Sequence, residues 1–137
     1  EGSDRARELV KVTKECFFEG IKHAVAGNHL NEICKAIEKY AKDRGFGVVR
    51  DLSGHGIGAH LHEDPEVPNF DMKRRGMKLR PGMTLAIEPM ITAGRDDVVW
   101  LDDDWTVVTD DGSMSAHYEN TILITEDKPE ILSLRQI

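Results

Sequence analysis

Three histidines and two glutamates are the side chains of this 137-residue sequence best suited to metal chemistry. His55 lies between glycines in the segment Ser53-Gly-His-Gly-Ile-Gly-Ala-His-Leu-His62, and Glu88 and Glu119 each lie in an otherwise apolar run. An ionised carboxylate in such a run is costly unless a cation or several hydrogen-bond donors meet it. Imidazole and carboxylate groups together are suitable ligands for a divalent metal. The pattern therefore indicates a metallohydrolase.

The two glutamates are predicted to point to a common place. Side chains alternate along a strand, so Ala86 and Glu88 share one face, as do His117 and Glu119. If the two strands are neighbours, the carboxylates converge and repel each other unless a cation lies between them. Either glutamate taken singly is better explained by a lysine or arginine partner on an exposed sheet face. Together with His55, the metal site becomes the better interpretation.

The histidines of the glycine-rich segment differ in what their neighbours suit them to do. His55 is the best ligand candidate, because glycines on both sides keep the loop flexible and let the backbone approach a metal closely. His62, before Glu63-Asp64, is suited to donate to a carbonyl or to a tetrahedral oxyanion. The alternative for His62 is a surface histidine paired with a carboxylate. His117 is expected to line the pocket without ligating, and His60 to be exposed.

Composition restricts the class of protein. The net charge of −7, with 39% hydrophobic and 31% charged residues, is typical of an ordinary globular domain and argues against nucleic-acid or membrane-surface binding. No apolar run has transmembrane length, and the N-terminus has no signal-peptide pattern. Cys16 and Cys34 occupy apolar-face positions, which favours buried thiols in a reducing compartment. We expect one cytoplasmic domain over residues 1–137.

Helices followed by antiparallel strands predict an α+β domain, with two helices packed on a mainly antiparallel sheet. The first helix is expected from a Ser3 cap to about residue 25, and the second from an Asn28 cap to Gly45. Residues 63–82 are expected to be loop, with at most a short strand. Strands are expected at residues 47–52, 83–91, 98–101, 105–109, 116–125 and 130–133. The acidic clusters Asp96-Asp97, Asp102-Asp103-Asp104 and Asp110-Asp111 are interpreted as turn residues on a solvated edge rather than a calcium site.

Five motifs occur in a fixed order along the sequence. They are Gly54-His-Gly-Ile-Gly58, His62-Glu-Asp-Pro65, Pro81-Gly-Met-Thr-Leu-Ala-Ile-Glu-Pro-Met90, Asp104-Trp-Thr106 and Ser115-Ala-His-Tyr-Glu-Asn-Thr121. In order and spacing they resemble a type I methionine aminopeptidase of bacterial kind, over essentially the whole chain. The resemblance implies the pita-bread fold of that family and a site for two divalent ions (Co, Mn, Fe or Zn). It also implies removal of the initiator methionine, with nascent polypeptide N-termini as the partners.

The resemblance also implies a role for individual residues. The metal ligands would be His55, Glu88 and Glu119. Glu119 would bridge both ions, and His62 would be the catalytic donor that contacts the scissile amide. The substrate pocket would be lined by His62, Trp105, Leu61 and His117. Leu61 stands where the family often has a bulky aromatic residue, which is a modest departure.

Two aspartate ligands of the family pattern are expected upstream of Glu1. The sequence is therefore interpreted as the C-terminal half of the catalytic domain, with the N-terminal half absent. On its own it is expected to bind metal weakly and to lack meaningful peptidase activity. It is also expected to self-associate through the face that the missing half would cover.

Two alternatives to a methionine aminopeptidase stay open. One is a proline-directed peptidase of the same fold, such as a prolidase or aminopeptidase P. The other is a non-catalytic pita-bread module that only binds partners. The motifs Ile87-Glu-Pro-Met90 and Ser115-Ala-His-Tyr-Glu119 favour the methionine branch, and the presence of the candidate ligands argues against the binding module.

Overall fold

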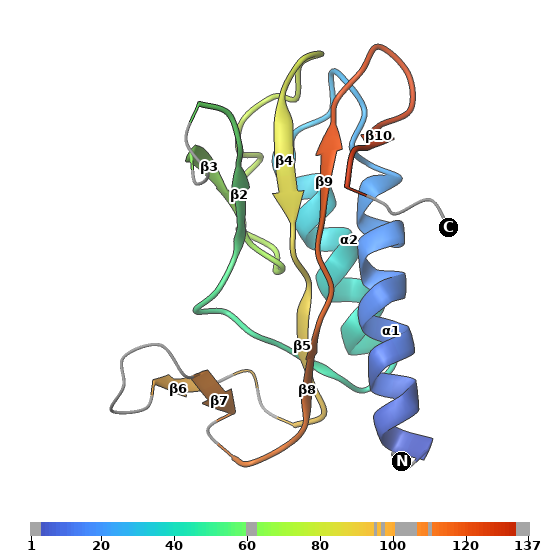
Figure 1. Cartoon of the computed structure of the whole chain (residues 1–137), viewed down its shortest axis with the longest axis vertical. Coiled ribbons are helices and arrows are strands. Elements are labelled where there is room, and N and C mark those ends of the chain that lie inside the picture. Colours follow the sequence, from blue (N-terminus) through green and yellow to red (C-terminus); the bar gives the residue numbers. More distant parts are fainter. Residues whose placement is uncertain are drawn as a thin grey trace.

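The structure, a computed structural model, describes residues 4–59, 63–94, 96, 98–100, 107–109 and 111–133. Two helices, α1 (Asp4–Ile21) and α2 (Leu30–Asp43), precede all the strands (Figure 1). The strands are β1 (Gly47–Val48), β2 (Gly54–Gly56), β3 (Glu63–Val67), β4 (Thr84–Ile87), β5 (Met90–Thr92), β6 (Val98–Trp100), β7 (Val107–Thr109), β8 (Ser115–His117), β9 (Asn120–Leu123) and β10 (Glu130–Ile131). Helices followed by strands confirm the α+β prediction.

Helix α1 presents an apolar face to the core, as the spacing predicts. Its residues Leu9, Val12, Cys16 and Phe17 are buried. The helix ends at Ile21 rather than near residue 25, because the next backbone groups form tighter turns in which His23 donates to Gly20 (3.1 Å) and Ala24 to Ile21 (3.0 Å). The expected cap, Ser3, lies outside the described residues.

Helix α2 is capped by His29 and not by Asn28. The Glu32 carboxylate accepts a hydrogen bond from the His29 backbone N–H (3.1 Å), and the His29 carbonyl accepts one from the Glu32 N–H (3.0 Å). Asn28 instead donates its side-chain amide to the His23 carbonyl (3.0 Å). Gly45 follows the helix with a φ of 81°, a left-handed conformation that suits glycine, so the predicted stop is confirmed.

All strand pairs in the described part of the chain are antiparallel. A five-stranded sheet has the order β10-β9-β4-β2-β3, a three-stranded sheet the order β1-β5-β8, and β6 pairs with β7. Figure 1 shows α1 and α2 side by side, with β5 and β8 passing along α1. Among the described residues, no helix is long and apolar enough to cross a bilayer.

The core lies between the helices and the sheets. It contains Phe17, Ile33, Ile37, Leu85, Ile87, Ile91 and Ile122, all essentially inaccessible to solvent. Cys16 and Cys34 are free and buried, as predicted, and burial raises the pKa of both thiols to about 12. These thiols are therefore protonated packing residues at neutral pH.

Several strand predictions need correction. The first strand covers only residues 47–48, and His55 lies in strand β2 rather than in a flexible loop. The expected strand over 83–91 is two strands separated by Glu88-Pro89, and that over 116–125 is two strands separated by Tyr118-Glu119. The strands expected near 98–101 and 105–109 are present over the described residues 98–100 and 107–109, and the strand expected over 130–133 covers only residues 130–131.

Candidate metal centre

Glu88 and Glu119 lie at matching breaks in one long antiparallel strand pair. Before the break Ile87 is opposite Asn120, and after it Met90 is opposite His117, so the register is unchanged and places Glu88 opposite Glu119. The Tyr118 N–H donates to the Pro89 carbonyl (3.1 Å) within the break. Like charges directly opposite each other destabilise a strand pair, so this register favours a cation between the two carboxylates.

His55 reaches the same place from the neighbouring strand. It is opposite Ala86, which lies two residues before Glu88 and therefore on the same face of the sheet. The flanking glycines allow this close packing: a Cβ at Gly54 would lie against the Ala86 carbonyl oxygen, and one at Gly56 against the Asp64 carbonyl oxygen. The glycines thus allow β2 to pack closely between β3 and β4, which differs from the predicted role of keeping a loop flexible.

The three side chains converge. One ligand atom from each of His55, Glu88 and Glu119 lies within 4.8 Å of the other two, and His55 Nε2 is 2.9 Å from Glu88 Oε2. We call this set the metal centre. His55 is buried, whereas the Glu119 side chain is 45% exposed. The set is therefore anchored in the sheet and open on the Glu119 side.

Hydrogen bonding at His55 shows that these donors suit a metal ion. Nδ1 of His55 lies 3.0 Å from the Gly56 carbonyl oxygen, which can only accept, so Nδ1 carries the proton. In a neutral imidazole Nε2 then presents a lone pair, and it faces a carboxylate oxygen of Glu88. A cation between Nε2 and the carboxylate satisfies both. A metal-binding histidine is commonly oriented by such a contact at its other nitrogen.

His117 lies beside both glutamates, where it was expected to line the pocket. Its Nε2 is 3.4 Å from Glu88 Oε1 and 4.0 Å from Glu119 Oε1. The hydrogen bond with Glu88 raises the pKa of His117 above its ordinary value, against the opposing effect of burial, and the charges of both glutamates add to the rise. His117 can therefore supply a positive charge next to the glutamates without joining the metal centre.

Some predicted site residues cannot be placed. His62, Leu61 and Trp105 lie outside the described residues, as does His60, so their roles stay predictions. Asn69, which the sequence did not indicate as a site residue, is fully buried and donates to the Glu88 carbonyl oxygen (2.8 Å). No pattern in the sequence marks Asn69, because its contact is with a backbone atom distant in the chain.

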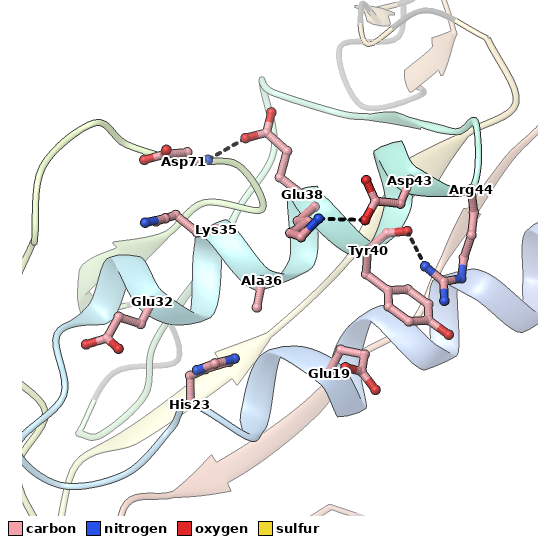
Figure 2. A pocket seen from close by; sticks show the side chains of 11 residues that line it. Glu19, His23, Glu32, Lys35, Ala36, Glu38, Tyr40, Asp43, Arg44 and Asp71 are labelled. Carbon is pink, nitrogen blue, oxygen red and sulfur yellow. Dashed lines mark hydrogen bonds and ion pairs between the residues drawn. The ribbon is translucent and has the colours of Figure 1, made fainter.

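One hollow of the described surface lies elsewhere. It has a volume of about 670 Å³ and lies over α2 and the end of α1, where Figure 2 shows mainly charged side chains. Several of these charges are already paired: Lys39 with Asp43 at 2.8 Å, and Glu38 with the Asp71 backbone N–H at 2.9 Å. None of the residues of the metal centre lines this hollow. Its size alone therefore gives no reason to place the chemistry there.

Comparison with known proteins agrees with the metal centre. Residues 1–126 match the profile of Metallopeptidase family M24. A methionine aminopeptidase of Clostridium acetobutylicum is 55% identical over 134 residues, which is 98% of this chain and 54% of that protein. Methionine aminopeptidase 1 of Bacillus subtilis is 47% identical over 131 residues, or 96% of this chain and 53% of that protein. The chain thus spans about half the length of these relatives.

Solved structures show the same fold. The crystal structure of a methionine aminopeptidase from Thermotoga maritima superposes with a TM-score of 0.95 at 47% identity, covering 98% of this chain and 54% of that one. A prolidase from Pyrococcus furiosus has a TM-score of 0.74 at 23% identity, covering 100% of this chain and 35% of that one, a likeness of fold alone. From its fold and its matched sequence, the chain belongs to metallopeptidase family M24, whose pita-bread fold it shares in part.

Proposed function

We propose that the intact protein is a metal-dependent methionine aminopeptidase that removes the initiator methionine from new polypeptides. The observation that carries this proposal is the convergence of His55, Glu88 and Glu119 within 4.8 Å. The similarity to the methionine aminopeptidases supports the choice of substrate. Because this chain spans about half of those relatives, the proposal concerns the intact protein.

The metal centre would hold the metal through one imidazole nitrogen and two carboxylates. We propose that His55, Glu88 and Glu119 would hold two divalent ions, as the family resemblance implies. Bound metal would supply Lewis-acid polarisation of the scissile carbonyl and activation of water. Mixed imidazole and carboxylate ligands suit Mn, Fe, Co and Zn alike, so the donor set does not choose among them.

The remaining site residues would bind and orient the peptide. His62 would donate a hydrogen bond to the oxygen of the scissile amide as negative charge develops on it. Trp105 and Leu61 would form an apolar wall around the methionine side chain, to which an indole ring contributes a large surface. His117, beside Glu88 and Glu119, would line the same pocket.

A proline-directed peptidase is the second candidate, because the prolidase from Pyrococcus furiosus shares the fold. That likeness is at 23% identity, whereas the methionine aminopeptidases reach 55%, and we therefore favour the methionine branch. A non-catalytic module is less well supported, because it gives no reason for two glutamates to oppose each other beside His55. A cytoplasmic location is part of the same proposal, and self-association stays a prediction.

A peptide panel tests the proposed function. The intact protein, loaded with Mn²⁺ or Co²⁺, is expected to release methionine from Met-Ala-Ser and to leave Ala-Pro peptides intact. The Glu88→Gln variant is the control, because any residual release then measures contaminating peptidases. Preference for Xaa-Pro peptides would favour the prolidase alternative, and metal binding without cleavage of any peptide would favour the binding module.

A further inference from the structure

Asn69 lies two residues after strand β3 and contacts the backbone of Glu88, a residue of the metal centre. Its side chain is 0% exposed, and its Nδ2 donates to the Glu88 carbonyl oxygen at 2.8 Å. We propose that Asn69 is a positioning residue that fixes the backbone of Glu88 so that the Glu88 carboxylate meets His55 and the metal. This inference rests on the proposed function, because it assigns a further residue to the same metal site.

The backbone of Glu88 needs an outside partner because it lies in a break of the sheet. The ladder between β4 and β9 ends at Ile87, and the ladder between β5 and β8 begins at Met90. Pro89, the residue between Glu88 and β5, is buried and has no N–H to donate. A backbone carbonyl in such surroundings requires a hydrogen bond from elsewhere. Asn69 supplies it.

The other polar atom of Asn69 shows how specific this role is. Its Oδ1 is buried and has no hydrogen-bond partner among the described residues. The bond to Glu88 is thus the polar contact that the structure gives this side chain. A side chain present only for packing would fill the space without leaving an unpaired acceptor, so the need for a carboxamide arises from the Glu88 carbonyl.

The segment that carries Asn69 is itself fastened to helix α2. The Asp71 N–H donates to Glu38 Oε1 (2.9 Å), and the Met72 N–H donates to Asn31 Oδ1 (2.8 Å). Asn31 Nδ2 in turn donates to Asp71 Oδ1 (2.9 Å). A donor held on such an anchored segment can define the position of Glu88, because groups around a metal ligand work by limiting its movement.

Metal titration of the apoprotein tests this role. Asn69→Ala in the intact protein is expected to weaken Mn²⁺ binding, measured by calorimetry, by about 10–100-fold, as loss of an outer partner of a metal ligand does. The matched control is Thr13→Ala, which removes another buried side-chain donor to a backbone carbonyl, that of Leu9 (2.6 Å), in helix α1 and not in the segment that carries Asn69. It is expected to keep the wild-type Mn²⁺ affinity within about twofold, although both variants lower the unfolding temperature measured in EDTA.

A second variant keeps the test decisive if Asn69→Ala does not fold. Asn69→Asp retains the shape of the side chain and replaces the donor with an acceptor, so it should lose affinity in the same way. An unchanged Mn²⁺ affinity in the Asn69 variants, or an equal loss in Thr13→Ala, would overturn the proposal. Failure of the proposed function is distinguishable, because a wild-type protein that binds Mn²⁺ but cleaves no Met-peptide refutes the activity while the affinity ratio still decides the role of Asn69.

Discussion

Carboxylates on the two sides of strand β5 have very different partners. Asp96, which follows the strand, accepts from Lys42 Nζ (2.9 Å) and from the Val48 N–H (2.8 Å), and lies 3.5 Å from Arg50 Nε. We call Asp96, Lys42 and Arg50 the Asp96 cluster. Glu88, which precedes the strand, has His55 and His117 beside it. Within the described residues, neither Glu88 nor Glu119 forms an ion pair with lysine or arginine.

The Asp96 cluster is complete without any added ion. Burial alone would raise the pKa of Asp96, but Lys42, the Val48 N–H and Arg50 together hold that pKa below its ordinary value. Asp96 does lie in a bend, as predicted, but its side chain is only 21% exposed and its carboxylate ties α2 to β1, so the prediction of a solvated edge is wrong here. Asp111 does act as a turn residue, because it accepts from the Ser113 N–H at 3.0 Å.

This difference in partners indicates which carboxylates are suited to bind a metal. A carboxylate surrounded by lysine and arginine is a structural element, whereas two carboxylates opposed in one strand register, with the His55 imidazole beside them, favour a cation from solution. This contrast explains why proximity of acidic residues alone is a poor guide to a metal site. The charged groups around a carboxylate distinguish a structural ion pair from a metal site.

Replacing Glu88 or Glu119 should have the largest effect on Mn²⁺ binding. A small effect would show that the metal centre and the Asp96 cluster do not differ in this way. In the intact protein, Glu88→Gln and Glu119→Gln should each weaken Mn²⁺ binding by more than the roughly 100-fold that loss of an outer partner can cost, and peptidase activity should fall to background. Asp96→Asn makes the same chemical change in the Asp96 cluster and should leave Mn²⁺ affinity unchanged. Similar losses in all three variants would show that the contrast is false.

Replacing His62 should separate catalysis from metal binding at the same centre. His62→Ala is expected to lower kcat by about 10²–10³-fold, because one donor to a developing oxyanion is lost. The number of Mn²⁺ ions bound per protein, measured by calorimetry, should not change. Near-wild-type turnover would mean that His62 is a surface histidine.

The Asp96 cluster should in turn control stability. Asp96→Asn is expected to lower the free energy of unfolding at pH 7 by about 1–2 kcal/mol, since partly buried donors lose a charged acceptor. Because the folded-state pKa of Asp96 is lowered, this advantage of the wild type is complete above the unfolded pKa of about 4, decreases as the pH falls below it, and is lost as the pH falls through the lower folded-state pKa. Denaturant unfolding at pH 7 and pH 3 measures the difference, and an advantage as large at pH 3 as at pH 7 would contradict this assignment.

Replacing Trp105 should have the smallest effect on the metal centre. Trp105→Ala is expected to raise KM for Met-initiated peptides by about tenfold, which is within the range for lost apolar contacts in a pocket. The side chain has no ligand atom, so metal affinity should be unchanged. Kinetics that do not vary across a series of first residues would exclude Trp105 from the pocket.

The helices were more predictable from the sequence than the details of the sheet. Apolar-face positions in the helices correctly identified Cys16 and Cys34 as buried, because burial of one face fixes the 3.6-residue period. The cap at His29 depends on where the Glu32 carboxylate reaches, which spacing does not reveal. The strand breaks likewise depend on partners far along the chain.

The candidate site shows the same division. Alternation along the strands predicted that Glu88 and Glu119 converge, and this is confirmed. The sequence did not show that His55 lies in a strand, since the cause is close backbone packing at Gly54 and Gly56. The role of Asn69 could not be predicted for a similar reason. Its contact is with the backbone carbonyl of Glu88, and such a contact requires no particular residue type at position 88.

Anomalous diffraction on crystals of the intact protein grown with Zn²⁺ tests the central claim most directly. The account predicts an anomalous peak about 2.0–2.2 Å from His55 Nε2 and from carboxylate oxygens of Glu88 and Glu119, which are the usual distances for zinc ligands. The Asp96 cluster in the same crystal should show no peak. Zinc bound elsewhere, with His55 still in direct contact with the Glu88 carboxylate, would contradict the assignment of the metal centre.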